Sequence, residues 1–210
     1  MVNEPSVVVK GTGTVNGIPD QCVMSLGLNG IAETAAEALE ICSQVAAQAI
    51  DACIGTGVSR GDVQSTNLAV RDFFDQVDQK VTARIASYQV KVRVTDLADV
   101  GPVLAAVSAA VGDALQIHSL QLVVSDATRL ETEARKLAVF DARKKAIELV
   151  ESAGLGLGTV LWIQDLGPSS LHGSVHATAA AFANPLASMS MEPGEIATTA
   201  SVTIAFSIEP

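Results

Sequence analysis

The chain has 210 residues, and 49% of them are hydrophobic, which is enough for a substantial core. It carries 23 acidic and 13 basic side chains, a formal net charge of −10, whereas nucleic acids and anionic membranes bind basic surfaces. One Trp, one Tyr and five Phe leave few rings on which bases could stack. We therefore expect an acidic globular protein that binds no nucleic acid.

The cysteines and the N-terminus bear on the cellular compartment. Cys22, Cys42 and Cys53 form no CxxC pair and are odd in number, which argues against a zinc knuckle or a disulfide framework. We expect small buried hydrophobes, with a redox pair as the alternative. The N-terminus lacks the pattern of a secretory signal, and no run reaches the roughly 18 apolar residues of a membrane span. The expected location is cytoplasmic if Met1 is the native start, and periplasmic or in the cell envelope if a signal peptide was removed.

The N-terminal stretch predicts two strands. Residues 6–15 are β-branched, and residues 21–31 alternate between apolar and polar side chains. The turn residues NGIPD between them favour a hairpin. The stretch GTGTVNG could be taken for a phosphate loop, but it leads into a strand, so its amides would not gather at a helix N-terminus.

A helix and a second strand pair come next. Residues 34–53 predict an Ala-rich helix with a capping box that starts at Thr34, and Gly55 and Gly57 end it. Strands at 63–73 and 81–95, joined by the polar turn DQVDQK, predict a second hairpin.

A short helix is expected to begin at Asp99 and to end at Val111, which places Pro102 in its first turn. A strand at 116–125 follows it.

Residues 126–153 predict a helix of about 42 Å. Thr128 and Glu131 form a capping box in a start region that also contains Ser125 and Asp126, and Gly154 can end the helix.

The apolar side chains of this long helix point in more than one direction, which predicts a helix that is deeply buried or shared with a partner subunit. Phe140 and Ile147 lie on a third, otherwise charged face. The basic stretch ARKK within it is interpreted as a solvated helix face, with an anion-binding patch as the alternative.

Strands at 159–166 and 195–208 complete the order ββαββαβαββ. Hairpins that alternate with crossing helices predict an α+β fold in which helices cover an antiparallel or mixed sheet. We expect one domain over residues 1–210, with a long loop at 167–191.

No catalytic constellation is visible. His172 and His176 would share one face of a helix, but no acidic or Cys partner stands at a useful spacing, so neither a metal nor a cofactor is predicted. A hydrolase would need a nucleophile beside a base; the remaining histidine, His118, lies in a strand, and no GxSxG is present. The chain is predicted not to be an enzyme.

The order of several short motifs resembles the SIMPL-domain family, which includes bacterial oxidative-stress-defence proteins and periplasmic immunogenic proteins. The matching stretches are VVVKGTGTV with Gly11 and Gly13, Pro19-Asp20, DVQSTNLAV with Thr66, Tyr88 before VKVRV, EARKLAVFDARKKAIELVESAG, and the closing EPGEIATTASVTIAFSI. Together they span residues 7–208. The chain departs from the family in lacking a signal peptide, in RDFFDQVD where a Pro-Tyr region is usual, and in IASY where a Gly is frequent.

The resemblance implies a fold of this strand order, no established catalytic centre, large ring-like or hollow homo-oligomers, and a role in envelope integrity and stress tolerance. We therefore expect a non-enzymatic protein that assembles with itself and has a structural or stress-defence role. The alternative is a small-ligand or protein-partner binding module that uses the 167–191 loop as a lid. The candidate oligomer contacts are Phe140, Ile147, His172, His176, Phe182 and Leu186.

Overall fold

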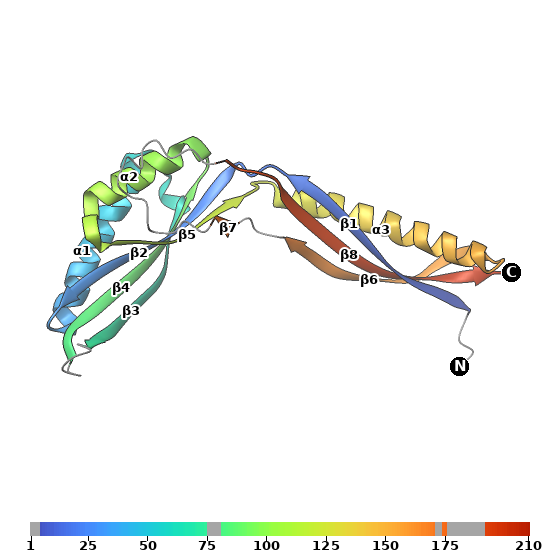
Figure 1. Cartoon of the computed structure of the whole chain (residues 1–210), viewed down its shortest axis with the longest axis horizontal. Helices are drawn as coiled ribbons and strands as arrows, with labels where there is room; N and C mark the ends of the chain where they lie inside the picture. The colour runs from blue at the N-terminus through green and yellow to red at the C-terminus, as the bar shows by residue number, and fades with distance from the viewer. Residues whose placement is uncertain (1–4, 75–80, 171–173, 176–191) are drawn as a thin grey trace. The chain divides into compact units, whose positions relative to one another are not determined.

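The structure is a computed structural model that describes residues 5–74, 81–170, 174–175 and 192–210. The chain forms two compact units, each with its own sheet and core (Figure 1). The α+β class and the predicted order of elements are confirmed, although the strands belong to two sheets and a short extra strand precedes the last one. The prediction of one domain over residues 1–210 stays a prediction.

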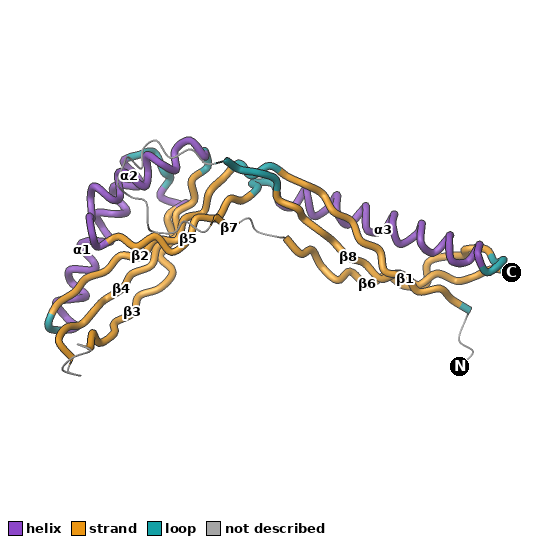
Figure 2. Tube along the Cα trace, viewed as in Figure 1, coloured by secondary structure: helices purple, strands orange, loops and turns teal. Residues whose placement is uncertain are grey.

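The first unit contains both ends of the described chain. It consists of β1 (Ser6–Gly17), α3 (Ala127–Ser152), β6 (Gly156–Ser170) and β8 (Ile196–Glu209). The three strands form an antiparallel sheet in the order β1-β8-β6. The helix α3 runs along one face of this sheet, over β1 and β8 (Figure 2).

A narrow stripe of small side chains joins α3 to its sheet. The buried positions recur every four residues, so the stripe turns by about 40° around the helix at each step. A stripe that winds in this way can follow a twisted sheet, which is why the apolar positions do not share one direction in the sequence. The buried residues of α3 are Leu130, Ala134, Ala138, Ala142, Ala146 and Val150.

The second unit consists of β2 (Gln21–Ala32), α1 (Ala35–Gly55), β3 (Val63–Phe74), β4 (Val81–Val94), α2 (Val100–Val111), β5 (Leu115–Val123) and β7 (Ser174–Val175). Its antiparallel sheet has the order β3-β4-β2-β5-β7, with α1 and α2 together on one side (Figure 2). The alternation read in β2 is confirmed, because Cys22, Met24, Leu26 and Leu28 are all buried.

The segment Leu97–Ala114 has the length and apolar composition of a membrane-crossing helix. It comprises α2 and a short 3-10 turn at each end, and Val100, Val103, Leu104 and Val107 are fully buried in the core of the second unit. Packing in that core accounts for its apolar side. The absence of a membrane span stays a prediction.

The predicted hairpin of residues 6–15 and 21–31 is wrong, whereas the hairpin of β3 and β4 is confirmed. The strand β1 pairs over its whole length with β8, and β2 pairs with β4 and β5. Directly after β1 the backbone N–H of Asp20 donates to the carbonyl of Val123, 3.1 Å away, so the chain continues beside β5 instead of folding back. Turn residues indicate a change of direction, but they do not specify which strand will be the partner.

One predicted helix start changes, and a second keeps its position but lacks the expected capping hydrogen bond. The N-cap of α3 is Asp126, whose Oδ1 accepts from the backbone N–H of Arg129 at 3.0 Å, while Thr128 lies inside the helix. Asp99 precedes α2 but makes no capping hydrogen bond, whereas Asp96 caps the turn before it. The capping by Thr34 is confirmed, and Gly154 follows α3 with φ +73°.

Candidate functional site

Two of the predicted contact residues lie together on the outer face of α3. The side chain of Phe140 is 70% exposed, and Ile147 is half-buried about two turns further along the same face. With Arg143, Lys144 and Glu148 they line an open surface hollow. We call Phe140, Arg143, Lys144 and Ile147 the α3 patch. The other four candidates, His172, His176, Phe182 and Leu186, lie outside the described residues, as does most of the predicted 167–191 loop.

The outer edge of β1 is covered by side chains from α3. Asp141 Oδ2 accepts from the backbone N–H of Thr12 at 2.8 Å and from Lys145 Nζ at 2.6 Å, while the same Nζ lies 3.3 Å from the carbonyl oxygen of Lys10. These contacts satisfy backbone groups that would otherwise be open to another strand. At these two backbone groups, in the middle of β1, this edge of the sheet is therefore closed.

The opposite edge of the sheet, formed by β6, is open. In the part of the chain that the structure describes, β8 is the only strand paired with β6. Five apolar side chains of β6 are between 39% and 56% exposed: Val160, Leu161, Trp162, Ile163 and Leu166. We call these five residues the β6 edge.

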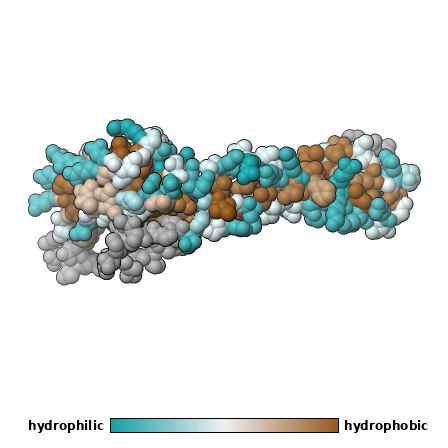
Figure 3. All heavy atoms as spheres, turned by 90° about the horizontal axis from the view of Figure 1, so that it is seen from above, coloured by the Kyte–Doolittle hydropathy of each residue, from teal (hydrophilic) through white to brown (hydrophobic). Residues whose placement is uncertain are grey.

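The pairing with β8 explains why both faces of β6 are apolar. Ile163 lies opposite Ile204, whose side chain faces α3, whereas Trp162 lies opposite Ala205 on the other face. The helix covers β1 and β8 but extends little over β6. Hydrophobic side chains therefore remain uncovered on both sides of one edge strand. Figure 3 shows one face of the molecule, on which brown, hydrophobic surface lies among polar side chains.

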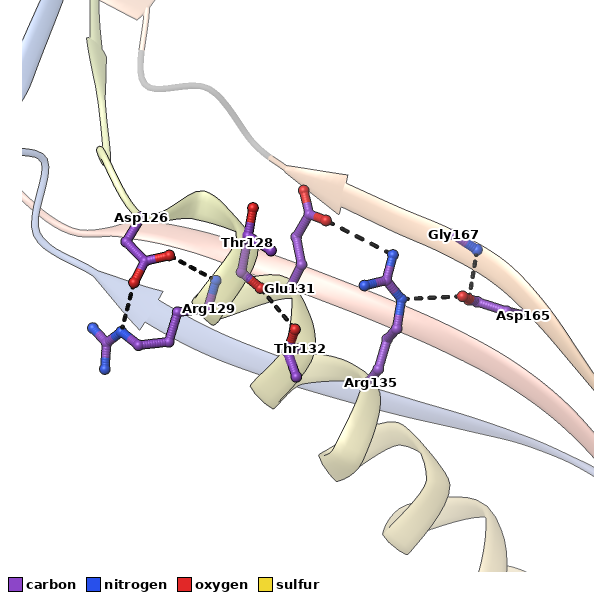
Figure 4. Close-up of polar contacts among 8 residues, drawn as sticks. All are labelled: Asp126, Thr128, Arg129, Glu131, Thr132, Arg135, Asp165 and Gly167. Atoms are coloured by element: carbon purple, nitrogen blue, oxygen red, sulfur yellow. Dashed lines mark hydrogen bonds and ion pairs between the residues drawn. The ribbon is translucent and has the colours of Figure 1, made fainter.

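An ion pair connects β6 to the N-terminal half of α3. Arg135 Nε donates to Asp165 Oδ2 at 3.0 Å, and the second oxygen of Asp165 accepts from the backbone N–H of Gly167 at 2.9 Å (Figure 4). Gly167 has φ +79°, a conformation that glycine adopts easily. These contacts connect the open edge strand to α3.

The sequence reasoning missed the β6 edge. Its signal was the unbroken apolar run VLWI, which is typical of a strand buried on both faces. The structure exposes this run, so these apolar side chains lack the packing partners that a strand of this composition usually has on both faces.

The described residues offer little reactive chemistry. All three cysteines are free and buried, and burial raises the pKa of the Cys22 and Cys53 thiols to about 11. These thiols are therefore protonated near neutral pH and are poor nucleophiles. Within the described ranges, no three His, Cys, Asp or Glu side chains are grouped so that they could hold a metal ion.

Replacing Asp141 by Asn should show how much the closed β1 edge contributes to stability. The hydrogen bond from Lys145, and then that from the Thr12 N–H, lowers the pKa of Asp141 below its ordinary value of 3.8. The stabilisation is therefore fully present above pH 3.8 and is lost as the pH falls through the lower pKa of the folded state. We expect Asp141→Asn to cost about 1 kcal/mol at neutral pH, because the contact is partly exposed.

The measurement is urea unfolding of both proteins across this pH range. The control is Glu151→Gln, an exposed position of α3, which should change stability little at any pH. A difference between Asp141→Asn and the parent that persists at low pH would contradict the assignment.

Sequence comparisons identify the relatives of this chain. The profile of the SIMPL family, described as a protein of unknown function (DUF541), matches residues 7–206. The chain is 31% identical over 175 residues to the 26 kDa periplasmic immunogenic protein of Brucella melitensis, covering 79% of this chain and 69% of that protein. It is 28% identical over 159 residues to the uncharacterized protein YggE of Escherichia coli K12, covering 74% of this chain and 63% of that protein. With nearly its whole length matched by the family profile, this chain belongs to the SIMPL family.

Proposed function

We propose that this chain is a non-enzymatic protein that assembles with itself into a ring or hollow particle and has a structural or stress-defence role. The observation that carries the proposal is the β6 edge, which presents apolar side chains on both faces of a strand that is paired on one side alone among the described residues. A strand of this kind favours pairing with another chain.

The match between two β6 strands favours a second copy of the chain as the partner. A strand that pairs with β6 has the apolar side chains of β6 beside it on both faces of the sheet. A strand that is itself apolar on both faces buries them best. The β6 strand meets that requirement, whereas β1 carries the polar side chains of Lys10, Thr12 and Thr14 on one face and has its edge covered by α3. Each side chain of this kind that becomes fully buried contributes about 1.5–3 kcal/mol.

The printed name of the Brucella relatives supports a location in the periplasm for this chain too. The cytoplasmic location expected if Met1 is the native start finds no support in the printed names of the relatives. Cell fractionation that recovered the native protein with the cytoplasmic contents would contradict a periplasmic location.

The test is the mass in solution at micromolar concentration, measured by light scattering coupled to size exclusion. The parent chain should have a mass several times the 21.6 kDa of one copy. With Leu161→Lys and Ile163→Lys together, the mass should fall by half or more, because two like charges per chain would face each other across the pair of strands.

A matched control places the same charges elsewhere. Gln64→Lys and Gln116→Lys alter two exposed strand positions of the second unit and should leave the mass unchanged. A parent chain with the mass of one copy would overturn the proposal of self-assembly, and an unchanged mass in the β6 double variant would overturn the assignment of the contact to β6.

A further inference from the structure

A hollow of about 260 Å³ lies between α1 and the edge strand β3 of the second unit. Leu39, Ala47 and Ile50 of α1 form one side of it, and Leu68 and Tyr88 lie in the sheet beside them. Leu68 is 54% exposed although it lies opposite Tyr88 on the face of the sheet that α1 packs against. We call these five residues the α1 groove.

We call two exposed carboxylates of α1, Glu40 and Asp51, the acidic border of the α1 groove, because each is next in sequence to a residue that lines it. The helix α1 contains Glu37, Glu40 and Asp51 and no basic residue. Glu40 and Asp51 follow Leu39 and Ile50 directly in the sequence, and both are exposed. Neither carboxylate is in an ion pair within the described part of the chain.

The α3 patch has the complementary chemistry. Phe140 projects from the first unit as its most exposed large hydrophobic side chain among the described residues, and Arg143 and Lys144 stand beside it. Lys144 lies only loosely near Glu148, at 3.9 Å, and Arg143 has no ion-pair partner within the described ranges. An aromatic ring with two cations beside it matches an apolar hollow bordered by two carboxylates.

We propose that the α3 patch of one copy docks into the α1 groove of a second copy, with Phe140 in the hollow and Arg143 and Lys144 facing Glu40 and Asp51. The inference rests on the proposed function and specifies one of its contacts. The patch and the groove are different surfaces, so the contact is head-to-tail, and repeated contacts of this kind close into a ring or extend into a filament. Opposite charges at the border select the partner and the orientation, while the apolar centre supplies the affinity.

The head-to-tail geometry gives a test by mixing two variants. Each chain carries Leu161→Lys and Ile163→Lys, so that pairing through β6 is suppressed and the docking contact is observed alone. Phe140→Glu removes the patch but leaves the groove, and Ala47→Arg fills the groove but leaves the patch. Both positions are exposed on helices, and Glu and Arg are good helix formers.

Sedimentation velocity at concentrations up to high micromolar should show that each variant alone has the mass of one copy. An equal mixture should form a complex of two copies that grows no further, because only one intact patch and one intact groove remain to meet. The chain with neither change should form larger species. If each variant, their mixture and the chain with neither change all have the mass of one copy, the docking contact is wrong.

Charge reversal provides a second, independent variant set. Arg143→Glu with Lys144→Glu, or Glu40→Lys with Asp51→Lys, should each weaken association at least tenfold, and the four changes in one chain should restore it.

Two other results would overturn the proposal. A contact between the two units of the same chain would change shape without changing mass. A different protein as the partner would leave every sample at the mass of one copy. Protected cysteines, and Trp162 fluorescence equal to that of the chain carrying only Leu161→Lys and Ile163→Lys, show that each variant in that background is folded.

The outcomes separate this inference from the proposed function. If the parent chain assembles and both the mixing and the charge-reversal experiments fail, the docking contact is wrong while self-assembly stands. If the parent chain has the mass of one copy at all concentrations, the proposed self-assembly itself is wrong.

Discussion

Gly11→Ala should destabilise the first unit by about 3 kcal/mol, because α3 leaves no room for a side chain at this position of β1. A Cβ at Gly11 would overlap the carbonyl oxygen of Ala138 and lie 2.6 Å from the nitrogen and 2.7 Å from the Cβ of Ala142. These are atoms of the helix backbone and its shortest side chains, so no side-chain rotation can relieve the overlap. The helix must move away from the sheet along part of its length, and buried contacts are lost.

The fluorescence of Trp162 measures this effect, because Trp162 is the single tryptophan of the chain and lies in the first unit. The matched control is Gly156→Ala in β6 of the same unit, where a Cβ would meet only Glu209 atoms at 3.6 and 3.7 Å, an ordinary contact. It should cost less than about 1 kcal/mol. Equal losses in both variants would mean that the alanine substitution itself, and not the contact with α3, is the cause.

Leu104→Ala should destabilise the second unit by about 3 kcal/mol. Leu104 is fully buried between α2 and the five-stranded sheet. Its removal leaves a cavity among Val, Met and Leu side chains that cannot collapse completely, so both the transfer free energy and the packing contacts are lost.

The cysteines provide the measurement, since Cys22 and Cys53 are buried in the same core and their thiols are protonated at neutral pH. A thiol reagent reaches them when the unit opens, so a loss of 3 kcal/mol should raise the rate of labelling by about a hundredfold. The control Leu68→Ala removes the same atoms from a side chain that is 54% exposed and should change the rate only a few-fold. A rise of equal size in the control would contradict the core assignment.

These two variants also test whether the units unfold separately. Gly11→Ala should shift the Trp162 transition and leave cysteine labelling unchanged if each unit is stabilised by its own core. Leu104→Ala should do the reverse. A shift of both signals in either variant would show that the units unfold together.

The helices and the faces of individual strands were predictable from the sequence because their signals are local. Thr34 is close in sequence to the N–H that it caps, and Gly154 follows the helix that it ends. The alternation in β8 likewise predicted the buried face that contains Thr198, Ala200, Val202, Ile204 and Phe206.

The candidate site was predictable in part. Phe140 stood out in the sequence because it interrupts a charged helix face, and the structure places it at the surface. The β6 edge did not stand out, because the run VLWI has the same composition whether a strand is covered on both faces or on neither. The acidic border of the α1 groove gave no signal either, since Glu40 and Asp51 are ordinary helix surface residues until β3 is placed beside α1.

The sequence by itself determined the class of fold, the order of helices and strands, and most of the side chains that face a core, since each depends on periodicity and caps within one segment. Tertiary structure alone decided that β1 pairs with β8, 179 or more residues away, and that the strands divide between two sheets. It also decided which sheet edge is closed by Asp141 and Lys145 and which is left open at β6. Strand pairing and edge cover depend on which distant segments meet, and a backbone hydrogen bond is almost independent of the side chains that flank it, so no local pattern specifies its partner.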